Sequence, residues 1–480
     1  MEAVAFFGLI AARVMAQTQS GVEHRTNTTN TTHAVSPLDS GDVAWLLVAA
    51  ALIFTMTPGL GFFYSGLAET KNSLSMLHVC MLIFSVVAVQ WSLFGYSISF
   101  SDTSSSVFIG NLRYAALLDT MDTQNKVAPT VPNSLWAMYQ MMAACITPGL
   151  WIGATAGRMR ILPTMVLALI WTTIVYDPIA YWVYGHNGWL HNLNVLDYAG
   201  GTLVHLSAGS TAFVLAAIMG RRVDYGQRDY ENHNPSYVYL GTALLWFGWM
   251  GFDGGCATSA NSRAVNAAFT TNLSGAVAGL IWMGLDTVVN KKRFSAIGYC
   301  TGAIAGLATM TAGSGLVQPG FGLIYGLCAG VFCFFGVQVM HFLRIDDSLD
   351  VAAVHGVGGS LGLLLTGVFA QYKVTATDIG SEVAVTAGWV DRVWIQVPVQ
   401  LAAIAAVAAW SMLWTALLVS VMNKIPILRL RVSAEEEVRG IDATEVGEQS
   451  YHFVALPTRE EIIMSKCECF MTETSNEILE

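Results

Sequence analysis

Long apolar runs limit what this chain can fold into more than any other feature. Eleven of them can be counted, at residues 43–66, 74–100, 133–156, 161–184, 198–219, 236–257, 263–288, 296–312, 318–342, 350–371 and 393–422. A helix of about 20 apolar residues crosses the ~30 Å hydrocarbon core of a bilayer and satisfies its own backbone hydrogen bonds there. Only 12% of the 480 residues are charged, about half the share in soluble proteins. The sequence therefore predicts an all-α polytopic membrane protein with eleven transmembrane helices.

The basic residues predict which way these spans run. Because eleven is odd, the two termini lie on opposite faces of the bilayer. If the N-terminus is outside, the inner loops and tail carry 16 Lys and Arg residues and the outer loops carry 5. Basic residues concentrate on the cytoplasmic side of membrane proteins. We therefore expect an extracellular N-terminal segment (1–40), a transmembrane domain (41–423) and a cytosolic tail (424–480) in a multi-pass protein of the plasma membrane.

The N-terminal segment holds two processing signals. Residues 1–16 contain a short apolar run and could be a signal peptide cleaved before Gln17, but the basic residues that normally precede such a run are missing. Both alternatives stay open. Asn27 and Asn30 each begin an Asn-Thr-Thr triplet, which is a glycosylation acceptor when it is exposed outside the cell. Glycosylation there would agree with the orientation that the basic residues predict.

Charge and motif content exclude several classes of protein. The net charge is −10, and residues 433–480 hold twelve of the 33 acidic residues. No basic stripe suited to nucleic acid is present. Neither an HExxH nor a CxxC motif appears, so we expect no metal site, no cofactor and no enzymatic activity.

Two stretches in different halves of the chain repeat one pattern. Asp197 stands eight residues before His205, and Asp347 stands eight residues before His355. A Gly-Ser pair follows each histidine at the same offset, as Gly209-Ser210 and Gly359-Ser360. Eight residues of helix rise ~12 Å, which places both histidines near the bilayer centre. The pattern predicts an inverted repeat of spans 1–5 and 6–10, with an eleventh helix outside it.

The histidines admit two interpretations. Ionisable residues are costly to bury in a membrane, so a functional role is the first hypothesis. The alternative is two core histidines that only hold the helix bundle together. Asp197 likewise either caps its helix or contacts a cation directly. One expected irregularity concerns Pro58, in Thr57-Pro58-Gly59, which predicts a break or kink in the first span.

Four separated motifs resemble the ammonium transporter family (Amt/Mep/Rh), nearest to its eukaryotic Amt/Mep members. They are Asp-Tyr-Ala-Gly-Gly-Thr-Leu-Val-His (197–205), Gly-Trp-Met-Gly-Phe-Asp-Gly-Gly (248–255), the stretch from Asp346 to Gly359, and a tail element with Gly440, Asp442, Gly447, Glu448 and Tyr451. The resemblance covers about residues 40–452. It implies a homotrimer of eleven-helix protomers with one pore in each protomer.

The resemblance also implies roles for single residues. His205 and His355 match the twin pore histidines, and Asp197 matches the acid that shapes the outer recruitment site. Phe252 matches one of the two phenylalanines of the outer gate, and Tyr139 matches an aromatic residue of the vestibule. Four positions depart from the family pattern: Ala143 replaces the other gate phenylalanine, Tyr184 a tryptophan of the recruitment site, Cys256 a serine, and Asp253 an asparagine. The recruitment site is then Asp197, Tyr139, Tyr184, Phe252 and Cys256, and the gate is Phe252 with Ala143.

Proton chemistry separates ammonium from potassium, which is similar in size. Acidic and aromatic groups at the outer mouth attract a cation, and an apolar pore disfavours any ion that keeps its charge. Ammonium sheds a proton and crosses as ammonia, while two hydrogen-bonded imidazoles pass the proton. We expect ammonium or ammonia as substrate, with methylammonium as a candidate second one.

The acidic tail suggests a regulatory segment that docks on the inner loops. Arg158, Arg160 and the run 291–293 are its candidate contacts. The alternative function is an ammonium sensor that signals through this tail. The sequence thus leaves a transporter and a sensor as the two readings.

Overall fold

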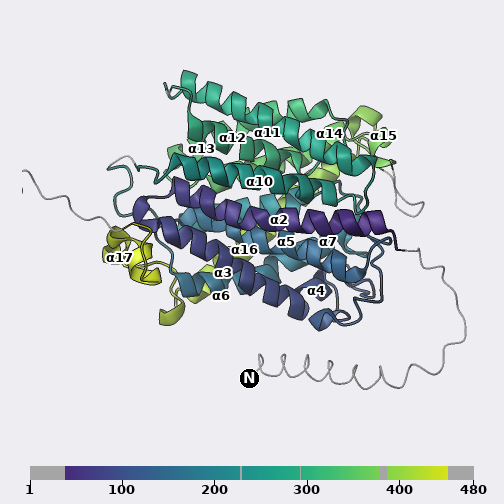
Figure 1. Cartoon of the computed structure of the whole chain (residues 1–480), viewed down its shortest axis with the longest axis horizontal. Coiled ribbons are helices and arrows are strands. Elements are labelled where there is room, and N and C mark those ends of the chain that lie inside the picture. The colour runs from purple at the N-terminus through teal and green to yellow at the C-terminus, as the bar shows by residue number, and fades with distance from the viewer. Residues whose placement is uncertain (1–37, 228–229, 292, 378–385, 452–480) are drawn as a thin grey trace, which may run out of the picture.

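The computed structural model describes residues 38–227, 230–291, 293–377 and 386–451 (Figure 1). This part of the chain is helical, and its long helices run side by side along the longest axis of the molecule (Figure 1). Among the described residues, eight helices are long and apolar enough to cross a membrane.

The spanning elements follow the expected order. They are α2 (Ser40–Leu67), α3 with α4 (Ser73–Gln90, Tyr96–Phe100), α5 (Asn133–Trp151), α6 with α7 (Ile161–Trp171, Asp177–Tyr184), α9 (Ser207–Met219), α10 (Pro235–Gly255), α11 (Ser262–Val288), α12 (Ala296–Met310), α13 (Phe321–Phe342), α14 (Gly358–Phe369) and α16 (Gln396–Met422). Each of the eleven expected spans therefore coincides with helix. Three of these, α5, α10 and the shorter α12, fall outside the eight that length and composition alone single out.

π-helical turns complete four of these spans. They are η2 (Trp91–Gly95), η5 (Thr172–Tyr176), η6 (Gly201–Leu206) and η7 (Ala352–Val357). The first two join α3 to α4 and α6 to α7. The other two lead into α9 and α14 and carry the two histidines.

Short helices make up the connections. They are η1 (Thr70–Asn72), η3 (Ala115–Leu117), η4 (Ile152–Thr155), α8 (Trp189–Asn192), α15 (Tyr372–Thr375), η8 (Trp389–Asp391), η9 (Pro426–Leu428), α17 (Ala434–Arg439) and η10 (Asp442–Val446).

The first span differs from its expectation. A break at Pro58 is wrong, because α2 runs without interruption from Ser40 to Leu67. Proline removes one backbone donor, but in a membrane helix the neighbouring helices can support the turn. α10 packs closely along α2, and a Cβ on Gly59 would lie 2.8 Å from the Leu244 Cβ.

Equivalent elements of the two chain halves meet each other. α2 packs against α10, which are the first and sixth spans. η6 packs against η7, and the contacts are reciprocal, since α9 lies on η7 and α14 lies on η6. This arrangement is what an inverted repeat of spans 1–5 and 6–10 requires. It brings the two histidine-bearing turns together in the middle of the protein.

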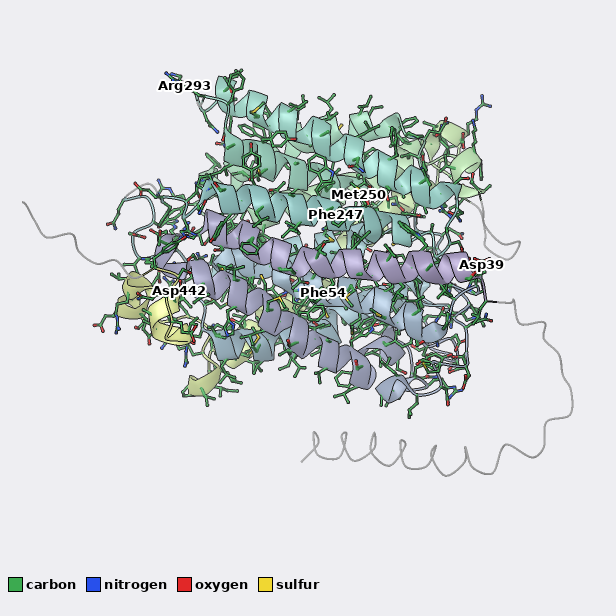
Figure 2. The ribbon with its side chains drawn as sticks, viewed as in Figure 1. Asp39, Phe54, Phe247, Met250, Arg293 and Asp442 are labelled. Carbon is green, nitrogen blue, oxygen red and sulfur yellow. The ribbon has the colours of Figure 1, made fainter. Side chains whose placement is uncertain are left out.

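The described ends of the chain lie at opposite ends of the helix bundle. Figure 2 shows Asp39 at one end and Asp442 at the other, with Arg293 at the same end as Asp442. The basic loop before α12 and the tail therefore share a face. This agrees with an odd number of spans.

Candidate functional site: a histidine pair between two cavities

Two buried imidazoles occupy the centre of the bundle. The Nδ1 atoms of His205 and His355 are 3.2 Å apart, and their rings stack at 5.2 Å with an angle of 18° between the planes. Both side chains are buried. The sequence prediction that these two segments bring their histidines side by side is confirmed. A shared Nδ1–Nδ1 hydrogen bond needs one proton between the two rings.

A threonine fixes where the protons sit. The Thr311 hydroxyl donates to the Leu307 carbonyl (3.0 Å) and accepts from the Trp249 indole N–H (2.9 Å). It also lies 3.3 Å from His205 Nε2. Since its one proton is already used, it can only accept from His205. On this basis we assign the His205 proton to Nε2, so that the shared bond runs from His355 Nδ1–H to His205 Nδ1.

Glycines allow the two histidine helices to approach this closely. A Cβ on Gly209 would lie 2.0 Å from the backbone nitrogen of Gly356. A Cβ on Gly359 would lie 2.8 Å from both the Gly201 carbonyl and the Leu206 nitrogen. Backbone atoms cannot move aside as the end of a flexible side chain can. The repeated glycines of the sequence therefore set the separation of the two imidazoles.

Asp197 is fully engaged by the protein itself. Its Oδ1 accepts from the backbone N–H groups of Gly200 (3.0 Å) and Gly201 (2.7 Å), and its Oδ2 accepts from that of Thr202 (2.7 Å). The Thr202 hydroxyl also donates to Oδ2. These are the unpaired donors at the start of a helix. The geometry is that of a helix cap, in which donors of the protein itself occupy both carboxylate oxygens.

A cavity of about 250 Å³ lies at the Cys256 end of α10. It is called the outer cavity, and the one at the opposite end the inner cavity, after the orientation that the basic residues predict. Asp197, Tyr184 and Cys256 line it together with Trp136 and Gln140. The Tyr184 hydroxyl is buried and has no hydrogen-bond partner in the part of the chain that the structure describes. The position that departs from the family tryptophan thus presents a hydrogen-bonding group next to this cavity.

The remaining predicted outer residues lie beneath the cavity. The buried Tyr139 hydroxyl donates to the Phe252 carbonyl and lies 3.3 Å from Cys256 Sγ. The Phe252 ring stands edge-on to the His205 ring at 6.3 Å. Ala143 is buried on α5. Phe252 therefore lies directly beside the histidine pair, and alanine supplies no ring opposite it.

The fourth departure, Asp253, is completely buried. Its Oδ2 accepts a hydrogen bond from the Thr271 hydroxyl, and its Oδ1 has no partner among the residues described. It joins the C-terminal end of α10 to Thr271 within α11.

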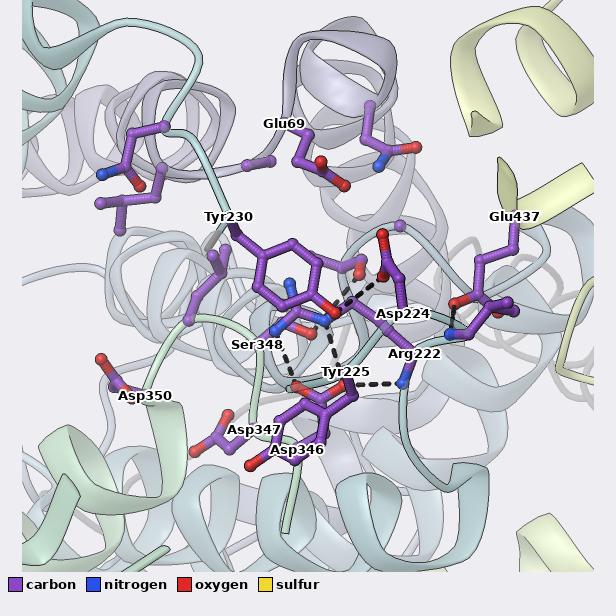
Figure 3. Close-up of a pocket in the computed structure, with 18 of the residues that line it drawn as sticks. Glu69, Arg222, Asp224, Tyr225, Tyr230, Asp346, Asp347, Ser348, Asp350 and Glu437 are labelled. Carbon is purple, nitrogen blue, oxygen red and sulfur yellow. Dashed lines mark hydrogen bonds and ion pairs between the residues drawn. The ribbon is translucent and has the colours of Figure 1, made fainter. Parts of the chain in front are cut away.

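An inner cavity of about 720 Å³ opens on the opposite side of the pair (Figure 3). A narrower space of about 20 Å³ adjoins His355 and shares Thr301 and Leu349 with it. The pair therefore stands between two cavities, separated from the inner one by a constriction.

An ion-pair network crosses the inner cavity. Asp346 accepts from Arg222 through both oxygens, at 2.7 and 3.0 Å, and pairs with the buried Arg158 at 3.4 Å. The Arg222 guanidinium lies 3.6 Å from the centre of the Tyr230 ring. Burial raises the pKa of Asp346, but the hydrogen bond and charge of Arg222 and the charge of Arg158 outweigh it and hold that pKa below its usual value.

The tail caps two transmembrane helices. The Asp442 carboxylate accepts from the backbone N–H groups of Leu74 (2.9 Å) and Ser75 (2.7 Å) at the start of α3. The Glu445 carboxylate accepts from the Ile161 N–H (3.1 Å) at the start of α6. The residues that precede these helices make no capping bond of their own. Such contacts satisfy backbone donors and place negative charge at the positive ends of helix dipoles.

The other predicted tail residues are two glycines with positive φ and two exposed side chains. Gly440 has φ of +95°, and a Cβ on it would lie 2.4 Å from the Lys71 carbonyl. Gly447 also has a positive φ (+79°). Glu448 and Tyr451 are exposed, and the Tyr451 ring contacts the His233 ring at 5.3 Å.

The basic tail contacts were predicted only in part. Arg160 pairs with Glu445 at 3.2 Å. Arg158 contacts the tail through its backbone carbonyl, which accepts from the Val432 N–H. Its side chain is fully buried, and its guanidinium binds Asp346. Lys291 and Arg293 form no hydrogen bond or ion pair with the tail residues described up to Tyr451. Position 292 lies outside the described residues, as do Asn27 and Asn30.

Sequence reasoning missed Trp249 and Thr311, which hold His205 in place. Trp249 stacks on the His205 ring at 5.4 Å. It lies in the motif 248–255, but the sequence did not predict a role for it. Thr311 has no signal in the sequence, because a threonine in an apolar helix usually bonds the preceding turn. In the described ranges, no group of three or more His, Cys, Asp or Glu side chains could hold a metal ion.

This fold and site define a class: a polytopic helical membrane protein whose centre holds paired imidazoles between an outer and an inner cavity. A sequence profile of the Ammonium Transporter Family matches residues 44–451. The chain belongs to the ammonium transporter family and is a transporter, not an enzyme.

Individual relatives agree with this assignment. Ammonium transporter 1 of Schizosaccharomyces pombe is 44% identical over 415 residues, which cover 86% of this chain and 83% of the relative. The crystal structure of Saccharomyces cerevisiae Mep2 superposes with a TM-score of 0.81 at 39% identity, covering 89% of this chain and 95% of that one. The fold expected from the sequence is thereby confirmed.

Proposed function

We propose that this protein carries ammonium inward across the plasma membrane as ammonia plus a separately relayed proton. The observation that carries the proposal is the 3.2 Å contact between the two Nδ1 atoms. An N–H bond of ammonium breaks at the outer end of the pore, ammonia crosses the apolar pore, and the proton passes through the imidazole pair. On the inner side ammonia takes up a proton again, so one positive charge crosses in each cycle.

The histidine pair has a direction at rest. His205 holds its proton on Nε2 against Thr311, and His355 shares its Nδ1 proton with His205. The free lone pair is then on His355 Nε2, while His355 lines the narrow inner space. A proton relayed inward enters at a lone pair on His205 Nε2, moves the shared proton from His205 Nδ1 to His355 Nδ1 and releases the proton of His355 Nε2. This transfer ends in the resting arrangement, so both tautomers must invert before the next one.

The outer cavity is the site where the cation is recruited. Tyr184 and Cys256 line it and offer an oxygen and a sulfur acceptor in place of the family tryptophan and serine. Asp197 supports this site through its charge, because its oxygens are occupied by backbone donors. Phe252 forms the barrier between this cavity and the histidine pair, and the Tyr139 hydroxyl donates to its carbonyl. Because Ala143 has no ring, only Phe252 supplies an aromatic side chain to this barrier.

A current measurement tests the electrogenic mechanism. Purified protein in liposomes is exposed to an ammonium gradient and, separately, to a potassium gradient. Current that scales with ammonium and is absent with potassium supports the relay. Passage of neutral ammonia alone would raise the internal pH without a current.

The functional unit is a homotrimer with one pore in each protomer, oriented with the N-terminus outside. The family assignment supports the trimer, and the excess of basic residues in the inner loops supports the orientation. The mass of the detergent-solubilised complex tests the first point, and access of an impermeant label to a cysteine placed near Leu38 tests the second.

The tail regulates transport by capping α3 and α6. Truncation after Leu430 removes Asp442 and Glu445, so the first turns of both helices lose their carboxylates, at a cost of about 1 kcal/mol for each cap. We expect a several-fold lower ammonium current for each trimer, with trimer assembly retained. Current from liposomes of equal protein content measures the effect.

Point variants separate capping from tail length. Asp442→Ala is expected to reproduce most of the loss, whereas Glu435→Gln changes an exposed acid of the same tail and leaves the current unchanged. Wild-type current in the truncated protein would exclude a regulatory role. A normal current with a lost cellular response to ammonium would instead support the sensor reading.

Asn27 or Asn30 is expected to carry a glycan in a eukaryotic host, because an external N-terminus meets the glycosylation machinery. Glycosidase treatment should lower the apparent mass of the wild type, and Asn27→Gln with Asn30→Gln should abolish the shift. An unchanged mass for wild-type protein at the cell surface would contradict the external N-terminus.

A further inference from the structure

The two acids that precede the histidine turns are used differently. Each accepts a backbone N–H from the residue five positions later, Thr202 for Asp197 and Ala352 for Asp347, both at 2.7 Å. The second oxygen of Asp197 is also occupied, by Gly200 and Gly201. Asp347 Oδ1 is buried and has no hydrogen-bond partner in the part of the chain that the structure describes. Both acids of the repeat therefore cap a helical turn in the same way, but only Asp347 keeps an oxygen without a hydrogen-bond donor within the described ranges.

Asp347 belongs to the wall of the inner cavity and is 8% exposed. In Figure 3 the dashed lines of the ion-pair network run to Asp346, while the Asp347 carboxylate lies on the side away from Arg222, toward Asp350. Arg222 of this wall and the buried Arg158 both pair with Asp346, and Lys71 of this wall pairs with Glu69. These positive charges are thus committed to other acids.

A buried carboxylate oxygen without a donor is unstable in this state. Taking up a proton or binding an external cation would each lower the free energy of this carboxylate. Burial, followed by the neighbouring charge of Asp350, raises the pKa of Asp347 to about 7. Near neutral pH the carboxylate and the acid are both populated, so a cation can compete with the proton.

We propose that Asp347 Oδ1 binds ammonium that enters the inner cavity from the cytosolic side. Ammonium carries four N–H donors and needs only one strong acceptor here, because water in the open cavity can accept the others. An alkali cation lacks these donors and would have to exchange its water for a single oxygen. The inference rests on the proposed inward transport. It adds a product site on the route out of the pore, eight residues before His355.

Ammonium bound at this site opposes its own influx. The inner cavity and the narrow space beside His355 share Thr301 and Leu349. A cation held at Asp347 therefore stands in the exit path and repels the relayed proton that leaves the pair. Influx slows when cytosolic ammonium rises, beyond the effect of the smaller gradient.

Several other charged or titratable groups face Asp347 and its cavity. Arg158 lowers the pKa of Asp347, against Asp350, and the Tyr64 phenol of α2 interacts with the Asp347 charge. Across the cavity lie Glu69 and Lys71 before α3, Arg222 and Asp224 after α9, His341 at the end of α13, and Glu437 of the tail. The pH test below is therefore read as a difference between variants that share all these groups.

Asp347→Asn tests the site with little change of shape. The amide oxygen can still accept from the Ala352 N–H, but the charge is lost. In inside-out patches with fixed ammonium in the pipette, ammonium added to the bath should inhibit the wild-type inward current. The half-inhibiting bath concentration, corrected for the gradient, is expected to rise about tenfold in Asp347→Asn. The half-saturating concentration on the pipette side should not change.

Acidification gives a second readout with a defined sign. Lowering the bath from about pH 8 to about pH 6 protonates Asp347, so inhibition of the wild type should weaken, whereas Asp347→Asn should show the weak inhibition at both values. Glu69→Gln removes another carboxylate of the same cavity and should keep wild-type inhibition. Equal effects in Asp347→Asn and Glu69→Gln would overturn the site, because they would point to the general charge of the cavity.

A binding measurement tests the site without a current, so it can also be applied to a variant that no longer conducts. Ammonium chloride, compared with sodium chloride, should raise the melting temperature of purified wild-type protein more than that of Asp347→Asn. Equal shifts would overturn the site even if the wild type carries current. A wild type without current but with the larger shift would reject electrogenic transport and keep the binding site. A pH effect without any dependence on bath ammonium would show that Asp347 binds protons only.

Discussion

His205→Ala is expected to abolish the electrogenic ammonium current. The change removes the ring that accepts the proton of His355 Nδ1 and that donates to Thr311. No other described side chain joins these two groups. The protein should still fold and assemble, because one lost buried pair costs about 1–3 kcal/mol. Current from liposomes, normalised to assembled protein, measures the effect.

The alternative of two structural histidines predicts the reverse. Assembly would then suffer, while each correctly assembled protein kept its current and selectivity. His355→Glu serves as the comparison, because it keeps an ionisable group at the inner ring. It should retain part of the conduction and discriminate less against potassium. Wild-type ammonium current without potassium leak in His205→Ala would disprove the relay.

Gly209→Ala is expected to break the same relay without touching a histidine. Its Cβ would lie 2.0 Å from the Gly356 nitrogen and 2.3 Å from the Gly356 Cα, where about 3.5–4.0 Å is needed. The helices must separate by ~1 Å or more, which takes the 3.2 Å Nδ1 contact out of hydrogen-bonding range. Overpacking of this kind costs about 1–3 kcal/mol. We expect near-complete loss of current and a lower melting temperature.

Gly284→Ala is the matched control on α11. No atom lies within 4 Å of a Cβ built at that position. Since alanine favours helix over glycine by about 1 kcal/mol, the control should melt at the wild-type temperature or slightly above it and keep its current. Wild-type current in Gly209→Ala would mean that the close helix approach is not required for the relay.

The sequence predicted the spans and the histidine pair because both follow from local rules. Apolar runs of about 20 residues determine where helices cross the bilayer, and the repeated acid-to-histidine spacing places both rings at one depth. It did not predict the π-helical turns around His205 and His355. Their composition does not differ from that of ordinary helix, and the extra residue in each turn depends on how η6 and η7 pack against each other.

The sequence also did not predict which polar side chains pair across long distances in the chain. Arg158 was a candidate contact of the tail, but its guanidinium pairs with Asp346, 188 positions away in the sequence. Several acids of the inner face could have served equally well by charge. Only the folded arrangement of the inner loops selects one, and the same holds for Thr311 beside His205. No sequence pattern indicates that Asp347 keeps one oxygen without a hydrogen-bond donor among the described residues.

The caps on α3 and α6 also have a consequence for biogenesis. Asp442 and Glu445 follow all eleven spans in the chain, whereas the helices that they cap are the second and fourth. In the proposed orientation, both helix starts remain open on the ribosome-facing side during translation until the last span has been inserted. The tail then closes an early part of the structure with residues synthesised late. Nascent chains that stall before residue 442 should therefore expose the starts of α3 and α6 to proteases, and complete chains should protect them.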